Sequence, residues 1–202
     1  MIYLDYAATT PVRPEVIQAM TEALTDAWGN PSSNHLAGHQ ARKGMDRARR
    51  QVAELVGVPP ESVIFTSGGT EADNLAIRGV ARALASKGRH LVISNIEHSA
   101  VRVTCKMLAE EGFETTEVPV GPNGVLDPEA VERAIRPDTI LVSVMHVNNE
   151  IGTIQPIAEI AERARMGKRR GGVLGLEADA ERRDRAARFA EPQHDFAAAL
   201  RG

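Results

Sequence analysis

The sequence is poor in cysteine, has no long apolar run and carries almost no net charge, and each scarcity excludes a class of protein. A single cysteine, Cys105, rules out a disulfide within the chain and is typical of a reducing compartment. The longest apolar run, residues 140–145, is far too short to span a bilayer, so we expect no membrane association. A net charge of −3 gives no electrostatic reason to expect a nucleic acid partner.

Lysine is also scarce, and the opening residues give no reason to expect export. The opening residues 1–6 contain no basic segment or cleavage pattern, so we expect a cytoplasmic location. The sequence has four lysines in all: Lys43, Lys87, Lys106 and Lys168. Because several kinds of cofactor chemistry need a lysine, this small set limits what the chain can do by itself.

The spacing of apolar residues predicts strands that alternate with helices. The expected strands are Ile2–Leu4, Val63–Thr66, Leu91–Ser94, Thr115–Val120 and Thr139–His146. The expected helices are one that begins at Pro14, then His39–Val56, Thr70–Ala85, Ser99–Glu111, Pro128–Ile135 and Pro156–Arg165. This alternation favours an α/β fold with parallel strand pairs.

Residues 66–74, Thr-Ser-Gly-Gly-Thr-Glu-Ala-Asp-Asn, follow the apolar run 63–65 and lead into a predicted helix. Glycines allow the backbone to approach an anion closely. The first turn of a helix offers N–H groups without intrahelical partners, together with the positive end of the helix dipole. The segment therefore predicts a phosphate-binding turn, although a Gly-Gly pair alone is more often a simple tight turn.

Four further segments accompany this turn in a fixed order. They are Leu4–Pro11 (LDYAATTP), Gly29–Gly38 (GNPSSNHLAG), Glu97–Val101 (EHSAV) and His146–Thr153 (HVNNEIGT). With the turn at 66–74, they closely resemble the cysteine desulfurases of the NifS/IscS type, in the class V aminotransferase superfamily. The resemblance runs from Ile2 to about Arg165 without an evident gap.

The resemblance implies a fold and a chemistry. The fold is that of the pyridoxal 5′-phosphate (PLP) enzymes of fold type I, whose large domain is an α/β/α sandwich with a mostly parallel sheet. Members of the family form homodimers, take sulfur from L-cysteine, leave L-alanine and transfer a persulfide sulfur to an acceptor such as an iron–sulfur scaffold protein. The resemblance implies no metal ion in the site.

Four residues match positions that contact the cofactor in the family. Gly69 and Thr70 match the phosphate ligands, which suits the N–H and hydroxyl donors of a helix start. His98 matches the catalytic histidine that stacks on the cofactor ring, and imidazole is both flat and able to titrate near neutral pH. Asn149 matches the donor to the ring hydroxyl, for which a neutral carboxamide is well suited. Each would usually be a turn or helix-start residue alone, but together they follow successive strands, where ligands of open α/β sheets bind.

Three elements of the complete chemistry have no match in this sequence. The lysine that anchors the cofactor and the acidic partner of its ring nitrogen lie, in the family, in Ser-x-His-Lys-like and His-x-Asp-like segments, and neither occurs here. Cys105 falls within a predicted helix on the face of Val101 and Leu108, so we interpret it as a core residue and not as the nucleophile.

The composition changes after Arg165, where the sequence becomes rich in Gly, Ala and Arg. We therefore expect residues 1–165 to be the N-terminal part of a class V domain. We expect residues 166–202 to be an unrelated tail, either read from a shifted frame or disordered.

Two alternatives to an inactive part of a cysteine desulfurase stay open. The first is another class V reaction, such as that of a selenocysteine lyase or an aminotransferase. The second is a non-catalytic fragment that only binds a partner.

Overall fold

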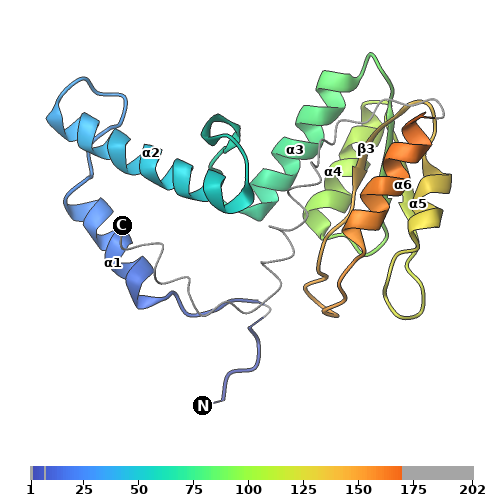
Figure 1. Ribbon diagram of the computed structural model, residues 1–202, viewed down its shortest axis with the longest axis horizontal. Helices are drawn as coiled ribbons and strands as arrows, with labels where there is room; N and C mark the ends of the chain where they lie inside the picture. Colours follow the sequence, from blue (N-terminus) through green and yellow to red (C-terminus); the bar gives the residue numbers. More distant parts are fainter. Residues whose placement is uncertain (1, 7, 170–202) are drawn as a thin grey trace. The chain divides into compact units, whose positions relative to one another are not determined.

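In the described residues, helices alone precede the first strand; helices and short strands then alternate, and the second half of the chain forms a layered α/β unit (Figure 1). The computed structural model describes residues 2–6 and 8–169. Its elements are α1 (Pro14–Thr25), α2 (Leu36–Val56), the 3-10 turn η1 (Pro60–Ser62), α3 (Gly69–Leu84), β1 (His90–Ser94), α4 (Ser99–Glu110), β2 (Glu114–Val118), α5 (Pro128–Ala134), β3 (Thr139–Ser143) and α6 (Ile157–Arg169). They divide into one unit up to Phe65 and another from Thr66. No described helix is long and apolar enough to cross a membrane.

The second unit is built on a three-stranded parallel sheet in the order β2-β1-β3. The five residues of β1 are all buried, because this strand is paired on both edges and covered on both faces. A bulge opposite His90 and Leu91 places one extra residue, Ile140, at the start of β3. The parallel pairing predicted from the sequence is thus confirmed.

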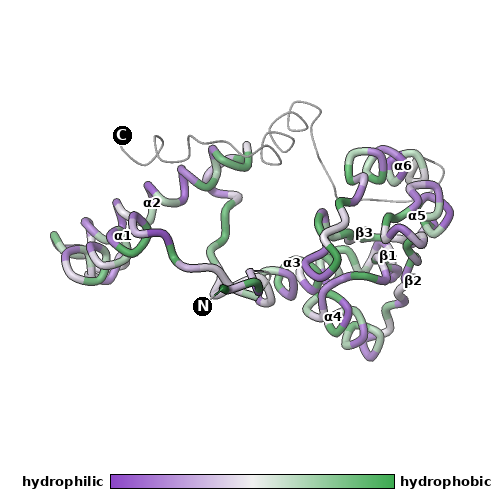
Figure 2. Tube along the Cα trace, turned by 90° about the horizontal axis from the view of Figure 1, so that it is seen from below, coloured by the Kyte–Doolittle hydropathy of each residue, from purple (hydrophilic) through white to green (hydrophobic). Residues whose placement is uncertain are grey.

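Helices cover both faces of this sheet and enclose two separate cores. On one face Leu91 and Ile93 of β1 pack with α3 and α4. On the other face Val92 packs with α5 and α6. This alternation follows from the two-residue period of a strand. Figure 2 shows α4 and α6 on opposite sides of the strands.

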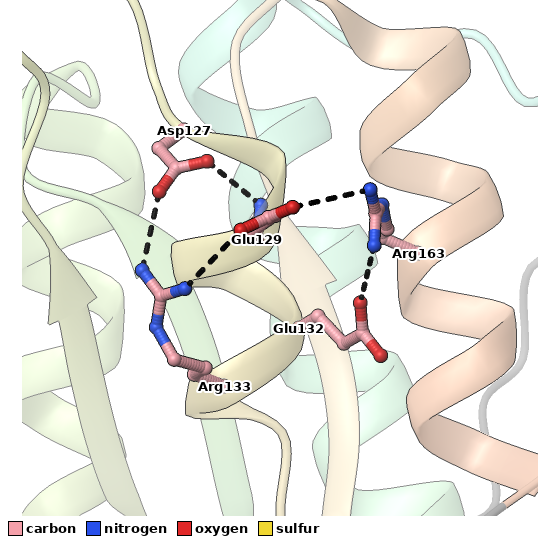
Figure 3. A network of polar contacts seen from close by, with 5 residues as sticks. All are labelled: Asp127, Glu129, Glu132, Arg133 and Arg163. Atoms are coloured by element: carbon pink, nitrogen blue, oxygen red, sulfur yellow. Dashed lines mark hydrogen bonds and ion pairs between the residues drawn. The ribbon is translucent and has the colours of Figure 1, made fainter.

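A set of ion pairs joins α5 to α6 on the second face (Figure 3). Arg163 of α6 reaches Glu132 at 3.2 Å and Glu129 at 3.4 Å, both on α5. Arg133 contacts Glu129 as well, at 3.7 Å, and Asp127 at 3.1 Å. Asp127, Glu129 and Arg133 are more than half exposed, whereas Arg163 and Glu132 are partly covered, so these pairs orient the two helices more than they stabilise the fold.

A buried histidine joins the three strands of the sheet. The imidazole of His90 on β1 is fully buried, with Nδ1 2.7 Å from the Thr139 hydroxyl of β3 and Nε2 2.8 Å from the Thr116 hydroxyl of β2. Burial is the main cause that lowers the pKa of His90, and the nearby Arg136 lowers it further, while Asp138 and Glu114 oppose this. The ring is therefore held neutral.

In the first unit, the loop before α2 lies against the start of that helix. The imidazole Nδ1 of His35 accepts a hydrogen bond from the Gly38 N–H, and the helix ends at Gly57 in the left-handed conformation. A Cβ at Gly38 would lie 2.2 Å from the Ser33 carbonyl oxygen. The glycine is therefore required by a close backbone approach.

Two predicted strands are absent from the described structure. Residues 63–66 and 2–4 pair with no neighbouring strand. Ile64 is 69% exposed and Leu4 is 87% exposed, whereas Val63 is buried. Strand propensity correctly indicates extended backbone, but a strand also needs a partner, which local sequence does not reveal.

The predicted helices are confirmed, with ends that differ by a few residues. Helix α6 continues past Arg165 to Arg169. The rest of the predicted tail, residues 170–202, lies outside the described residues.

We predict that Gly38→Ala lowers the free energy of unfolding by about 1–3 kcal/mol, because the added methyl group overlaps the Ser33 carbonyl oxygen. Gly44→Ala in the same helix is the matched control, since no atom lies within 4 Å of its added Cβ. It should stabilise the helix by up to about 1 kcal/mol. Urea unfolding followed by circular dichroism measures both values, and equal effects would contradict the close approach.

We also predict that His90 makes folding stability depend on pH. The unfolded state takes up a proton near pH 6.5, whereas the folded state does so only at lower pH, so stability falls as pH drops below about 6.5. Urea unfolding at a series of pH values should show a shallower dependence for His90→Gln than for the wild type. Parallel curves would show that His90 carries no such linkage.

Candidate functional site

His98 and Asn149 lie beyond the carboxyl ends of β1 and β3, and this end of the sheet is called its carboxyl edge. His98 follows β1 and Asn149 follows β3, and the two strands are parallel neighbours. From β1 the chain crosses to β2 on one side, whereas β3 pairs on the other side. The space beyond β1 and β3 is therefore a topological switch point, where open α/β sheets bind their ligands.

The predicted phosphate turn forms the start of α3. Gly69 and Thr70 are the first two residues of this helix, and both are exposed. Glu71 accepts hydrogen bonds from the Ser67 N–H at 2.7 Å and the Ser67 hydroxyl at 2.6 Å, which lower its pKa and keep it ionised. These bonds fix the turn. The first N–H groups of α3, like those of any helix, have no acceptor within the helix.

His98 caps α4 with its own side chain. Its Nδ1 accepts the N–H of Ala100 at 3.1 Å, while the residue as a whole is exposed. Because Nδ1 acts as an acceptor, the neutral ring carries its proton on Nε2. The helix-start role and the catalytic role considered for His98 are thus compatible, since the cap fixes the ring and leaves Nε2 available.

Asn149 lies in a tight turn after β3 that Asn148 organises. The Asn148 side-chain oxygen accepts the N–H groups of Glu150 at 2.9 Å and Ile151 at 3.0 Å. Asn148 is 6% exposed, whereas Asn149 is exposed and its amide donates to Glu150 at 2.8 Å. The turn therefore presents the second asparagine to solvent and buries the first.

Sequence reasoning assigned no role to Glu97 and Asn148, which connect the two turns. One oxygen of the Glu97 carboxylate accepts the Met145 N–H at 2.8 Å and the Ser94 hydroxyl at 2.5 Å. The Asn148 amide donates to the Ile96 carbonyl at 3.1 Å. Both residues belong to the motifs that were recognised in the sequence. The signal that could have identified them is that each is a polar residue directly before a predicted ligand.

The start of α3 is connected to the start of α4 as well. The Asn74 amide donates to the Thr70 carbonyl at 2.8 Å, and the Thr104 hydroxyl lies 2.8 Å from the Asn74 side-chain oxygen. The same hydroxyl lies 2.7 Å from the carbonyl of Ala100, whose N–H binds His98. Hydrogen bonds thus link the phosphate turn to the predicted ring-stacking residue through neighbouring side chains.

Cys105 lies outside this edge, in the core between α4 and the sheet. It is 2% exposed, and burial raises the pKa of its thiol to about 11. A thiol in this state is a poor nucleophile. Its interpretation as a core residue is confirmed.

The described residues fit part of PLP. The start of α3 suits a phosphate, the capped His98 ring offers a flat face, and Asn149 offers an amide donor. Lys87 precedes β1 and so belongs to the opposite edge of the sheet, while Lys106 lies within α4. Neither follows a strand, as an anchor at this edge would.

Comparison with known proteins places this geometry in a family. Residues 2–175 match the aminotransferase class-V family. The chain is 50% identical over 164 residues to the cysteine desulfurase IscS of Dictyoglomus turgidum, covering 81% of this chain and 42% of the relative. It is 54% identical over 167 residues to the IscS of Pseudomonas aeruginosa, covering 81% and 41%. The chain thus spans about two fifths of the length of these curated relatives.

Solved structures agree with the fold. A NifS-like protein superposes with a TM-score of 0.81 at 36% identity, over 89% of this chain and 49% of the other. A structure described as SspA in complex with cysteine gives a TM-score of 0.78 at 39% identity, over 82% and 48%. The parallel sheet is therefore that of the NifS-like α/β fold, and the chain belongs to the aminotransferase class-V family.

Proposed function

We propose that this chain supplies the phosphate, ring and ring-oxygen contacts of a PLP site of the cysteine desulfurase type. The observation that carries the proposal is the set of three turns fixed at one edge of the sheet. They present the α3 start, His98 and Asn149, and the residues that hold the last two, Ala100 and Asn148, are buried. About 50% identity to curated IscS proteins over most of the chain supports it.

The residues have separate tasks in this proposal. Gly69 and Thr70 bind the phosphate with backbone N–H groups and a hydroxyl. His98 stacks on the ring and moves a proton at Nε2, because its Nδ1 is already bound to Ala100. Asn149 donates to the ring oxygen. When bound, PLP withdraws electrons from the α-carbon of an amino acid substrate.

L-cysteine is the substrate that we propose for the complete site, with L-alanine and a persulfide sulfur as products. The similarity to SspA, which was solved in complex with cysteine, favours it over the substrate of a selenocysteine lyase or an aminotransferase. We further propose a homodimer in the cytoplasm that delivers sulfur to an acceptor such as an iron–sulfur scaffold protein. The family resemblance is what supports these assignments.

By itself, the chain should have little or no desulfurase activity. Its one thiol is buried with a raised pKa, and the segments that would bring the anchoring lysine and the acidic partner of the ring nitrogen are absent from the 202 residues. A fragment that only binds a partner remains the second candidate, and it shares this expectation.

We predict that Thr70→Val weakens PLP binding about tenfold, since it removes a hydroxyl that donates to a charged phosphate. Equilibrium dialysis with PLP measures the affinity. Thr115→Val is the matched control, because this hydroxyl lies near the start of β2, at the opposite edge of the sheet. Equal affinities for the two variants would refute the phosphate assignment.

We predict that sulfide release from L-cysteine in the presence of PLP is at least about a hundredfold slower than for the complete Pseudomonas aeruginosa relative, because the nucleophile and the anchor are both lacking. Cys105→Ala should leave the residual rate unchanged. A rate near that of the relative, or its loss in Cys105→Ala, would overturn this expectation.

A further inference from the structure

Two buried side chains connect the turns after β1 and β3 in opposite directions. Glu97, in the turn after β1, accepts the N–H of Met145 at 2.8 Å from the turn after β3. Asn148, in the turn after β3, donates to the carbonyl of Ile96 at 3.1 Å in the turn after β1. Each turn therefore contributes one side chain and one backbone group to the other.

Each of these side chains directly precedes a residue of the candidate site. Glu97 is followed by His98, and Asn148 is followed by Asn149. In both pairs the first residue is buried and the second is exposed. A shift of either connecting side chain would therefore move the exposed neighbour relative to the other turn.

The cost of burying these groups indicates a specific role. Glu97 is 7% exposed, and burial raises the pKa of its carboxyl group, with Asp73 of α3 adding to the effect, while the bonds from Ser94 and Met145 oppose it. An apolar residue would fill the same space without desolvating a carboxylate. The hydrogen bonds that Glu97 accepts and Asn148 donates supply what packing alone does not, namely a defined register between the two turns.

The geometry points to Glu97 and Asn148 as a reciprocal pair of positioning residues that fixes His98 and Asn149 relative to each other for ligand binding. This inference rests on the proposed function for the identity of the ligand. The coupling between the turns is independent of the proposed function, because it is a property of the free chain.

Conservative substitutions separate positioning from mere burial. Glu97→Gln keeps a side-chain oxygen for the Met145 N–H and the Ser94 hydroxyl, whereas Glu97→Ala removes it. Asn148→Asp keeps the acceptor for Glu150 and Ile151 within its own turn but loses the donor to Ile96. Asn123→Asp is the matched control, because the Asn123 side-chain oxygen accepts the Val125 N–H within an exposed turn after β2.

The experiment measures three quantities on the full 202-residue chain, with circular dichroism to confirm that each variant is folded. They are the amide hydrogen-exchange rate of Met145, the NMR signals of the His98 imidazole and the affinity for PLP. In Glu97→Ala, exchange at Met145 should be about tenfold faster, and Glu97→Gln should restore the wild-type rate. In Asn148→Asp the His98 signals should shift although the substitution lies in the other turn, and Asn123→Asp should leave them unchanged.

Affinity for PLP should fall about tenfold in Glu97→Ala and Asn148→Asp and stay within about twofold in Glu97→Gln and Asn123→Asp. Unchanged His98 signals in Asn148→Asp, or wild-type affinity in both disruptive variants, would overturn the positioning role. If the wild-type chain does not bind PLP, the proposed function fails. The exchange and imidazole measurements still decide whether the two turns are coupled.

Discussion

The burial of β1 on both faces and both edges is the constraint on which the rest of the second unit depends. Parallel strands need crossovers between them: α4 connects β1 to β2, and α5 then connects β2 to β3 on the other side of β1. The carboxyl ends of the three parallel strands then lie together at the carboxyl edge of the sheet. The turns that follow β1 and β3 meet there because of the sheet topology, before any particular side chain is considered.

Buried polar groups in this unit are placed where they connect elements. His90 joins the strands at one end of the sheet through two threonine hydroxyls, and Glu97 and Asn148 join the turns at the other end. Gln155 is 2% exposed and bonds the Leu126 N–H and the Gly124 carbonyl. Each satisfies the requirement that a polar group removed from water be hydrogen-bonded, and each restricts the relative movement of two segments.

Local sequence was sufficient to predict the elements whose signals are local. The helical period predicted α3 and α4, and the predicted end of α2 at Val56 is correct. The predicted start of α2 lies three residues after the observed start at Leu36, because the cap is His35, a residue type with a weak capping preference. Residues 63–66 have the composition of a strand, but pairing is a property of the whole fold.

The candidate site also contains residues that the sequence could reveal and residues that it could not. The exposed residues Gly69, Thr70, His98 and Asn149 were predicted because they stand in long motifs in a fixed order. Whether they contact a cofactor stays a prediction. Glu97 and Asn148 could not be assigned a role, since their importance comes from being buried against a turn about fifty residues away, and burial of that kind depends on the tertiary structure.

The register of the sheet has a consequence for the order of folding. The contact of His90 with Thr116 of β2 closes a loop of 26 residues, whereas its contact with Thr139 of β3 closes one of 49. The longer closure costs about 0.6 kcal/mol more in chain entropy, and topologies with distant contacts fold more slowly. The β1-α4-β2 segment can therefore form first, with β3 docking afterwards. The turn that carries Asn149 is then the last to join His98, so a chain arrested before that stage would lack one of the three turns of the candidate site.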